Sequence, residues 1–160
     1  RRMLYEYCKE RGVEHKQCGK LIVATSVAQL EELQKILAVS QKNGLVGPEA
    51  LKLLSPEEAI GMEPQVRCTG ALYSPSTGIV NSHELMLALL ADAEGSGAML
   101  ALKTPVNGGE LMSDGRILLR TPEMEIECDE FVICSGLAAP RLASQICGFR
   151  KDLIPISRFA

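Results

Sequence analysis

Apolar residues recur at intervals of three or four along much of the chain, a spacing that places them on one face of a helix. Helices are predicted over residues 2–11, 26–42, 83–94 and 138–147. Ser26 is followed three residues later by Gln29, and this capping-box pattern marks the start of the second helix. Ser55 precedes a proline and two glutamates, which predicts the start of a further, short helix.

Short runs of apolar or alternating residues, bounded by turn-forming residues, predict strands between these helices. The predicted strands are residues 21–24, 70–74, 99–106, 110–113, 116–121, 124–128 and 131–134. Asp114-Gly115 separates two of them and is typical of a two-residue hairpin. The order of helices and strands, with no internal repeat, predicts an α+β (mixed α/β) fold.

The composition is ordinary for a globular protein, with 46% hydrophobic and 23% charged residues in a chain of 160. The net charge of −3 and the lack of a basic run interleaved with aromatics argue against nucleic-acid binding. No apolar stretch approaches the roughly 20 residues of a membrane span, so no transmembrane segment is expected. The first residue is Arg1 rather than methionine, and we expect the sequence to be an internal part of a longer protein.

Six cysteines and two histidines offer little metal or redox chemistry. No two cysteines have the C-x-x-C spacing of a zinc site or a dithiol, so we expect reduced structural thiols and no bound metal. Cys134 lies in an apolar run and is expected to be buried. His15 lies between charged residues and His83 at a helix start, which favours a surface position over a general-base role for both.

The apolar segment 131–134 leads through Ser135 and Gly136 into a predicted helix. A turn of this kind lets backbone N–H groups approach a phosphate or a ribose. The alternative is an ordinary buried strand followed by a glycine turn. Lys20 precedes another apolar strand, where it either reaches an anionic substrate or faces water as a strand-end lysine.

Several motifs occur in the order and spacing of the L-2-hydroxyglutarate dehydrogenase family, which the sequence resembles over nearly its whole length. These motifs are Cys18-Gly19-Lys20-Leu21-Ile22-Val23-Ala24, Asn43-Gly44, Glu63-Pro64, the run from Ala71 to Val80, and Cys134-Ser135-Gly136-Leu137. The family belongs to the D-amino-acid-oxidase-like group of FAD enzymes. The first and fourth motifs together are specific to the family, whereas the Ser-Gly element is shared across the wider group.

The resemblance implies that FAD is the cofactor. A valine such as Val106 meets the adenine through its backbone, and the turn that follows residue 134 lies near the pyrophosphate and ribose. The cofactor-binding candidates are therefore Val106, Ser135, Gly136 and Leu137. The candidates on the substrate side are Lys20, Gly78 and Ile79. The catalytic base is expected to lie outside this chain.

The same resemblance implies part of a two-domain FAD-dependent oxidoreductase, with a substrate domain built on a mixed sheet and part of the FAD-binding domain. Residues 1–12 are expected to form a helix at the junction of the domains, and residues 13–97 to form part of the substrate domain. Over residues 98–160 the chain is expected to belong to the FAD-binding domain again. The GxGxxG half of that domain is absent from the chain, and Asn81 stands where an aspartate is usual. We therefore expect the isolated chain to be inactive.

The family oxidises L-2-hydroxyglutarate to 2-oxoglutarate by hydride transfer from C2 to flavin N5. The implied partner is a small-molecule 2-hydroxy acid, while the electron acceptor stays open. The alternatives are a sister FAD oxidoreductase for another small hydroxy or amino acid, a truncated non-catalytic binding fragment, and a cysteine-based redox or metal protein. Family analogy implies a mitochondrial protein if the source is eukaryotic, and a cytoplasmic one, or one peripheral on the inner membrane, if it is bacterial.

Overall fold

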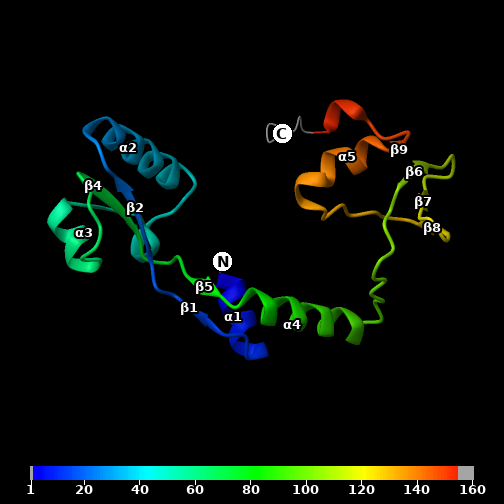
Figure 1. Ribbon diagram of the computed structural model, residues 1–160, viewed down its shortest axis with the longest axis horizontal. Helices are drawn as coiled ribbons and strands as arrows, with labels where there is room; N and C mark the ends of the chain where they lie inside the picture. Colours follow the sequence, from blue (N-terminus) through cyan, green and yellow to red (C-terminus); the bar gives the residue numbers. More distant parts are fainter. Residues whose placement is uncertain (1, 155–160) are drawn as a thin grey trace. The chain divides into compact units, whose positions relative to one another are not determined.

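The computed structural model describes residues 2–154, and the chain divides into two compact units, residues 1–98 and 99–160 (Figure 1). Arg1 and residues 155–160, at the ends of the predicted segments 1–12 and 98–160, lie outside the described residues. Both units combine helices with mainly antiparallel strands, which confirms the predicted mixture of α and β structure. None of the helices in the described part is long and apolar enough to cross a membrane.

A three-stranded antiparallel sheet lies at the centre of the first unit, with strand order β2-β4-β3. Its strands are β2 (Lys20–Ala24), β3 (Lys52–Leu54) and β4 (Gly70–Ser74). The strands predicted at residues 21–24 and 70–74 are confirmed. Ile22 lies opposite Leu72 in the register of β2 and β4. Most of β4 is buried because it has a neighbouring strand on each side.

Helices α2 (Val27–Lys42) and α3 (Pro56–Met62) pack against this sheet (Figure 1). The apolar stripe of α2 buries Leu33, which belongs to one hydrophobic cluster with Ala24 and Leu72. The partly buried side chains packed against this cluster are Ile22, Leu30, Leu37 and Leu51. Full burial of a leucine side chain contributes about 2 kcal/mol, so the cluster stabilises the packing of α2 on the sheet. The 3-10 helix η1 (Gly47–Glu49) leads into β3.

Ser55 and Ser26 both occupy helix N-caps, but the capping box forms at Ser55 and not at Ser26, where the sequence predicts it. The Ser55 hydroxyl accepts a hydrogen bond from the backbone N–H of Glu58, and the Glu58 carboxylate accepts one from the backbone N–H of Ser55 at 2.7 Å. Ser26 makes no side-chain capping bond, so the capping box predicted at α2 is wrong. The Gln29 side chain instead accepts hydrogen bonds from the backbone N–H and the hydroxyl of Thr25.

Ser55→Ala is expected to lower the free energy of unfolding by about 1 kcal/mol, because the backbone N–H of Glu58 loses its acceptor. Ser26→Ala is the matched control, and its cost should stay below about 0.5 kcal/mol because no side-chain bond is lost. Urea unfolding of the full-length protein measures both variants. Equal losses for the two serines would contradict this description of the caps.

The other elements of the first unit are α1 (Arg2–Arg11), α4 (Ser82–Gly95) and a two-stranded ribbon of β1 (His15–Lys16) and β5 (Ile79–Val80). The helices confirm the predictions over residues 2–11 and 83–94. Gly12 follows α1 with a φ of 68°, as a C-terminal stop requires. Asn81 caps α4, because its side-chain oxygen accepts a hydrogen bond from the backbone N–H of Glu84. An asparagine serves this role as well as the aspartate usual in the family.

A four-stranded sheet with strand order β8-β7-β6-β9 forms the centre of the second unit. Its strands are β6 (Gly108–Leu111), β7 (Ile117–Arg120), β8 (Glu125–Cys128) and β9 (Ile146–Cys147). The first three are antiparallel, and β9 joins β6 in parallel. The strands predicted around residues 110–113, 116–121 and 124–128 are therefore present, with shifted ends.

The β6–β7 hairpin confirms the turn predicted at Asp114-Gly115. Its loop spans residues 113–115 rather than two residues, because the backbone N–H of Met112 donates to the carbonyl of Arg116 at 2.8 Å. The side-chain hydrogen bond from Arg116 lowers the pKa of the Asp114 carboxyl. This pair is exposed, so it orders the turn more than it stabilises the unit.

Two strands predicted for the second unit are absent. Residues 99–106 and 131–134 form no strand, and both leave apolar side chains in solvent: Met99 is 94% exposed and Val132 77%. A strand needs a neighbour for its backbone N–H and C=O groups, and neither segment pairs with another described strand. Cys134 is consequently exposed, and the prediction that it is buried is wrong.

The helix predicted over residues 138–147 is shorter than expected. The 3-10 helix η2 (Gly136–Ala138) leads into α5 (Ala139–Ser144), after which β9 and the 3-10 helix η3 (Lys151–Leu153) follow. Ile146 leaves the helical pattern because it packs over β6 and is buried there. Gly109 makes room for it, since a Cβ at Gly109 would lie 3.2 Å from the Ile146 side chain.

Candidate functional site

A cavity of about 450 Å³ opens in the second unit beside the start of β6. Three segments line it: the residues before β6, the turn at Ser135, and α5 with the residues next to it. The lining residues are Val106, Asn107, Ser135, Ala138, Arg141, Leu142 and Gln145. Small-molecule sites commonly enclose roughly 300–1,000 Å³, and this cavity is within that range.

Backbone hydrogen bonds hold these segments together. Asn107 N–H donates to the carbonyl of Arg120 at 2.8 Å and extends the β6–β7 ladder. Gly109 N–H donates to the carbonyl of Gln145 at 3.2 Å and ties the end of α5 to β6. Gly108 has a φ of 149°, and a Cβ there would lie 2.8 Å from the Gln145 carbonyl oxygen. Only glycine therefore allows α5 and β6 to approach this closely.

Two of the predicted cofactor-binding residues, Val106 and Ser135, lie in the wall of this cavity. Gly136 and Leu137 follow in η2, where both are exposed and lie outside the lining set. Gly136 has a φ of 56°, and apart from its two chain neighbours no described residue has an atom within 4 Å of the place where a Cβ would be. Its backbone therefore borders open space.

Sequence reasoning missed the other lining residues, which are Asn107, Ala138, Arg141, Leu142 and Gln145. No local pattern marks them. They come together because β9 pairs in parallel with β6, a contact between residues far apart in the sequence. The only sequence signals near them were the glycines at 108 and 109, which permit that contact.

The lining residues fit one half of a flavin dinucleotide. Val106, Ala138 and Leu142 offer apolar surface against which a base can lie. The hydroxyl and carboxamide groups of the lining can hydrogen-bond a ribose or a phosphate, and a guanidinium adds a positive charge. This mixture of apolar wall and convergent polar groups is typical of cofactor sites.

Two further cavities, of about 350 and 210 Å³, lie along the β1–β5 ribbon of the first unit. Both are lined by His15, Ile79 and Val80. The larger adds Glu14, Lys16 and Asn81, and the smaller adds Leu4, Tyr5, Cys8, Thr77 and Gly78. Two substrate-side candidates, Gly78 and Ile79, therefore border these cavities. The third, Lys20, is exposed at the start of β2 and lines neither.

His15 is half-buried in β1 rather than placed in a solvated loop. Its ring lies 5.8 Å from that of Tyr5, centroid to centroid. Nδ1 is 2.7 Å from the carbonyl oxygen of Val13. A carbonyl only accepts, so Nδ1 donates in this bond and Nε2 is the acceptor of the neutral ring. His83 is exposed in the first turn of α4, as predicted.

The loop of residues 74–78, beside the smaller cavity, is held by hydrogen bonds from two directions. The Tyr5 hydroxyl, on α1, donates to the carbonyl of Ser76 at 3.2 Å. Gly19 N–H donates to the carbonyl of Thr77 at 2.8 Å. These bonds fix the loop backbone against both α1 and the residue that precedes β2.

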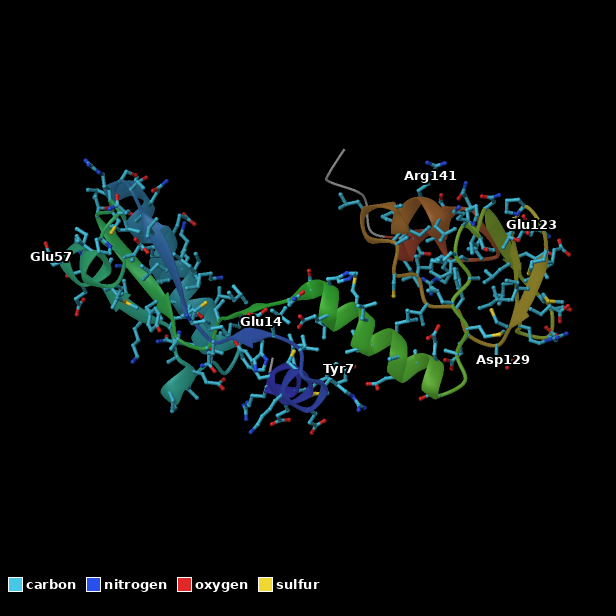
Figure 2. The ribbon with its side chains drawn as sticks, turned by 60° about the horizontal axis from the view of Figure 1, so that its bottom comes forward. Tyr7, Glu14, Glu57, Glu123, Asp129 and Arg141 are labelled. Carbon is cyan, nitrogen blue, oxygen red and sulfur yellow. The ribbon has the colours of Figure 1, made fainter. Side chains whose placement is uncertain are left out.

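Asp92 joins α4 to α1 outside these cavities. The Tyr7 hydroxyl, labelled in Figure 2, donates to Asp92 Oδ2 at 2.8 Å, and Arg11 forms a salt bridge with the same carboxylate at 3.0 Å. Desolvation and the hydrogen bond to Asp92 raise the pKa of the Tyr7 phenol. The phenol therefore acts as a hydrogen-bond donor between α1 and α4.

All six cysteines are free thiols. Cys8 is buried and borders the smaller ribbon cavity, whereas Cys18, Cys134 and Cys147 are exposed. Within residues 2–154, no three side chains of His, Cys, Asp or Glu come together as a metal site.

The model of the DAO family of FAD dependent oxidoreductases matches residues 1–159. Human mitochondrial L-2-hydroxyglutarate dehydrogenase is 32% identical over 161 residues, which cover 94% of this chain and 34% of that protein. The mitochondrial enzyme of the same name from Arabidopsis thaliana is 30% identical over 190 residues, covering 100% of this chain and 39% of that protein. The chain thus spans little more than a third of the length of these relatives.

Solved structures show the same fold. L-proline dehydrogenase from P. horikoshii aligns with a TM-score of 0.76 at 22% identity, covering 90% of this chain and 38% of that one. Glycine oxidase from Geobacillus kaustophilus aligns with a TM-score of 0.71 at 26% identity, covering 90% and 39%. Because the family model extends over almost every residue, the chain belongs to the DAO family of FAD-dependent oxidoreductases.

Proposed function

We propose that the full-length protein carrying this chain is an FAD-dependent dehydrogenase that oxidises L-2-hydroxyglutarate to 2-oxoglutarate. The chain is 30–32% identical to the human and Arabidopsis proteins of that name over 94–100% of its length. The observation within the chain that carries the proposal is the cavity shared by Val106 and Ser135, both expected from the family resemblance to lie next to FAD. The activity is assigned to the full-length protein, because the relatives extend well beyond this chain.

In this proposal, residues 98–160 belong to the FAD-binding domain and hold the adenosine half of the cofactor. Val106 meets the adenine through its backbone, and Ser135, Gly136 and Leu137 lie beside the ribose and pyrophosphate. Bound flavin supplies the hydride acceptor for C2 of the substrate. The chain's own residues orient the cofactor and keep water from its adenosine half.

Residues 13–97 belong, in the same proposal, to the substrate domain, and residues 1–12 to the junction. Gly78 and Ile79 border the ribbon cavities and are assigned to the substrate side. Lys20 is an exposed cation at the start of β2, suited to attract a dicarboxylate. The catalytic base is assigned to a part of the protein outside this chain.

The cofactor provides the first test. Full-length protein purified without added flavin is expected to carry FAD in near-stoichiometric amount. Heat denaturation releases the flavin, and chromatography against FAD and FMN standards identifies it. Protein that carries FMN, or no flavin after incubation with FAD, would contradict the proposal.

A second candidate is an FAD oxidoreductase for another small hydroxy or amino acid. It is favoured by the fold similarity to proteins named L-proline dehydrogenase and glycine oxidase. Identity to those two is 22% and 26%, against 32% for human L-2-hydroxyglutarate dehydrogenase, so the hydroxy acid is preferred. Reduction of the flavin by a panel of these acids separates the candidates.

We infer a mitochondrial location if the source is eukaryotic, because the human and Arabidopsis relatives are named mitochondrial. For a bacterial source we infer, by analogy with the family, a location in the cytoplasm or peripherally on the inner membrane. We propose no identity for the electron acceptor that reoxidises the flavin, and no site for it on this chain. No nucleic-acid partner is proposed for a chain of net charge −3.

A further inference from the structure

Among the arginines that the structure describes in the second unit, Arg141 alone has no carboxylate partner within residues 2–154. Arg116, Arg120 and Arg150 each form a salt bridge with an acidic side chain. Arg141 lies on α5, at the outer surface of this unit (Figure 2), and lines the 450 Å³ cavity. No aspartate or glutamate is among the other lining residues, so its positive charge is uncompensated there.

Hydrogen-bonding groups accompany this charge. The hydroxyl of Ser135 and the carboxamides of Asn107 and Gln145 line the same cavity. A guanidinium donates two parallel hydrogen bonds to a phosphate, and neutral donors complete the coordination of the remaining oxygens. The lining therefore suits a phosphate ester whose organic part lies against the apolar wall.

We infer that Arg141 binds a phosphate of the dinucleotide and thereby raises the affinity for FAD. The inference rests on the proposed function, because it takes this cavity to be the site of the adenosine half. Arg141 is not one of the residues that the sequence motifs predict. Its contact is with the phosphate and not with the reacting atoms, so it sets cofactor affinity rather than the chemistry of hydride transfer.

Titration of the full-length apoprotein with FAD, followed by flavin fluorescence, tests this role. Arg141→Gln is expected to raise the Kd for FAD roughly tenfold, the cost of losing one charged hydrogen-bonding partner. Arg141→Lys should raise it less, because the charge remains. Added salt should raise the Kd for FAD more in the wild type than in Arg141→Gln. The wild type has the exposed Arg141 charge, which salt screens, and the variant lacks it.

Arg150→Gln is the matched control, because Arg150 belongs to the same unit, pairs with Asp152 and does not line the cavity. It should retain the wild-type Kd. If thermal melting shows that Arg141→Gln misfolds, Arg141→Met, which keeps the apolar stem, replaces it. A neutral, folded variant with the wild-type Kd and salt dependence would overturn the inference and leave the FAD assignment intact. A full-length protein that binds no FAD would overturn the proposed function itself.

Discussion

Gly78→Ala is expected to lower the free energy of unfolding by about 2–3 kcal/mol, because a methyl group at this position has no room. A Cβ would overlap the Tyr5 hydroxyl and the carbonyl oxygen of Lys16. Neither neighbour is free to move, since the Tyr5 hydroxyl bonds to Ser76 and Lys16 pairs with Ile79 in the ribbon. The added methyl group therefore displaces α1 or the β1–β5 ribbon, and with it the walls of both ribbon cavities.

Gly61→Ala is the matched control. Gly61 lies in α3, and no atom of the described residues outside its own helix turn comes within 4 Å of an added Cβ. Alanine is also the better helix former. This change should leave the free energy of unfolding unaltered or raise it by up to about 1 kcal/mol. Urea unfolding of the full-length protein measures both variants. Equal stabilities of the two variants would show that Gly78 is not packed as described.

Residues 1–160 produced alone are expected to purify without bound FAD. Enzymes with a glycine-rich GxGxxG turn hold the pyrophosphate on its backbone N–H groups, and the 160 residues contain no such motif. The cavity at Val106 and Ser135 then supplies only part of the contacts. We expect the isolated chain to bind FAD at least ~100-fold more weakly than the full-length protein does.

The isolated chain is also expected to self-associate, because residues 99–106 and 131–134, which have strand-like sequences but form no strand, leave apolar side chains in solvent. Met99, Leu102 and Val132 are 94%, 73% and 77% exposed in these segments. Unpaired segments of this kind add to the strands of other chains. Size-exclusion chromatography and flavin absorbance, with the full-length protein as the control, measure both effects. A monodisperse 1–160 chain carrying stoichiometric FAD would contradict both expectations.

Local sequence signals predicted the first unit well. The start of α3 at Ser55-Pro56 lies where the sequence places it, because the cap depends on residues close together in the chain. The apolar run of β4 is also a strand, and it finds partners in β2 and β3 within the same unit. The prediction of a capping box at Ser26 was wrong because of a neighbouring residue. Thr25 offers two donors to Gln29, and the motif takes no account of that competition.

The second unit was harder to predict because its elements depend on distant partners. Residues 99–106 and 131–134 have strand-like sequences, yet a strand forms only where a neighbouring backbone accepts its hydrogen bonds. The reverse error occurred at Ile146-Cys147, which continues a helical pattern but forms a strand through its parallel pairing with β6. Neither outcome is encoded within the segment concerned.

The residues of the candidate site likewise include some that the sequence predicted and others that it did not. Val106 and Ser135 were predicted from a family resemblance and lie in one cavity, although nothing in their own neighbourhoods indicates that they meet. Arg141 and Gln145 were not predicted, since they reach that cavity only through the approach of α5 to β6. A pattern read along the chain identifies which residues can bind a nucleotide, whereas the long-range pairing decides which of them share a site.

Anaerobic addition of L-2-hydroxyglutarate to the purified full-length protein tests the central claim most directly. Hydride transfer to the flavin bleaches its absorbance near ~450 nm, so the reaction is seen without any knowledge of the electron acceptor. We predict bleaching by L-2-hydroxyglutarate and none by glycine or L-proline under the same conditions. An unchanged spectrum with L-2-hydroxyglutarate would contradict the claim, and bleaching by one of the amino acids instead would assign the protein to the second candidate.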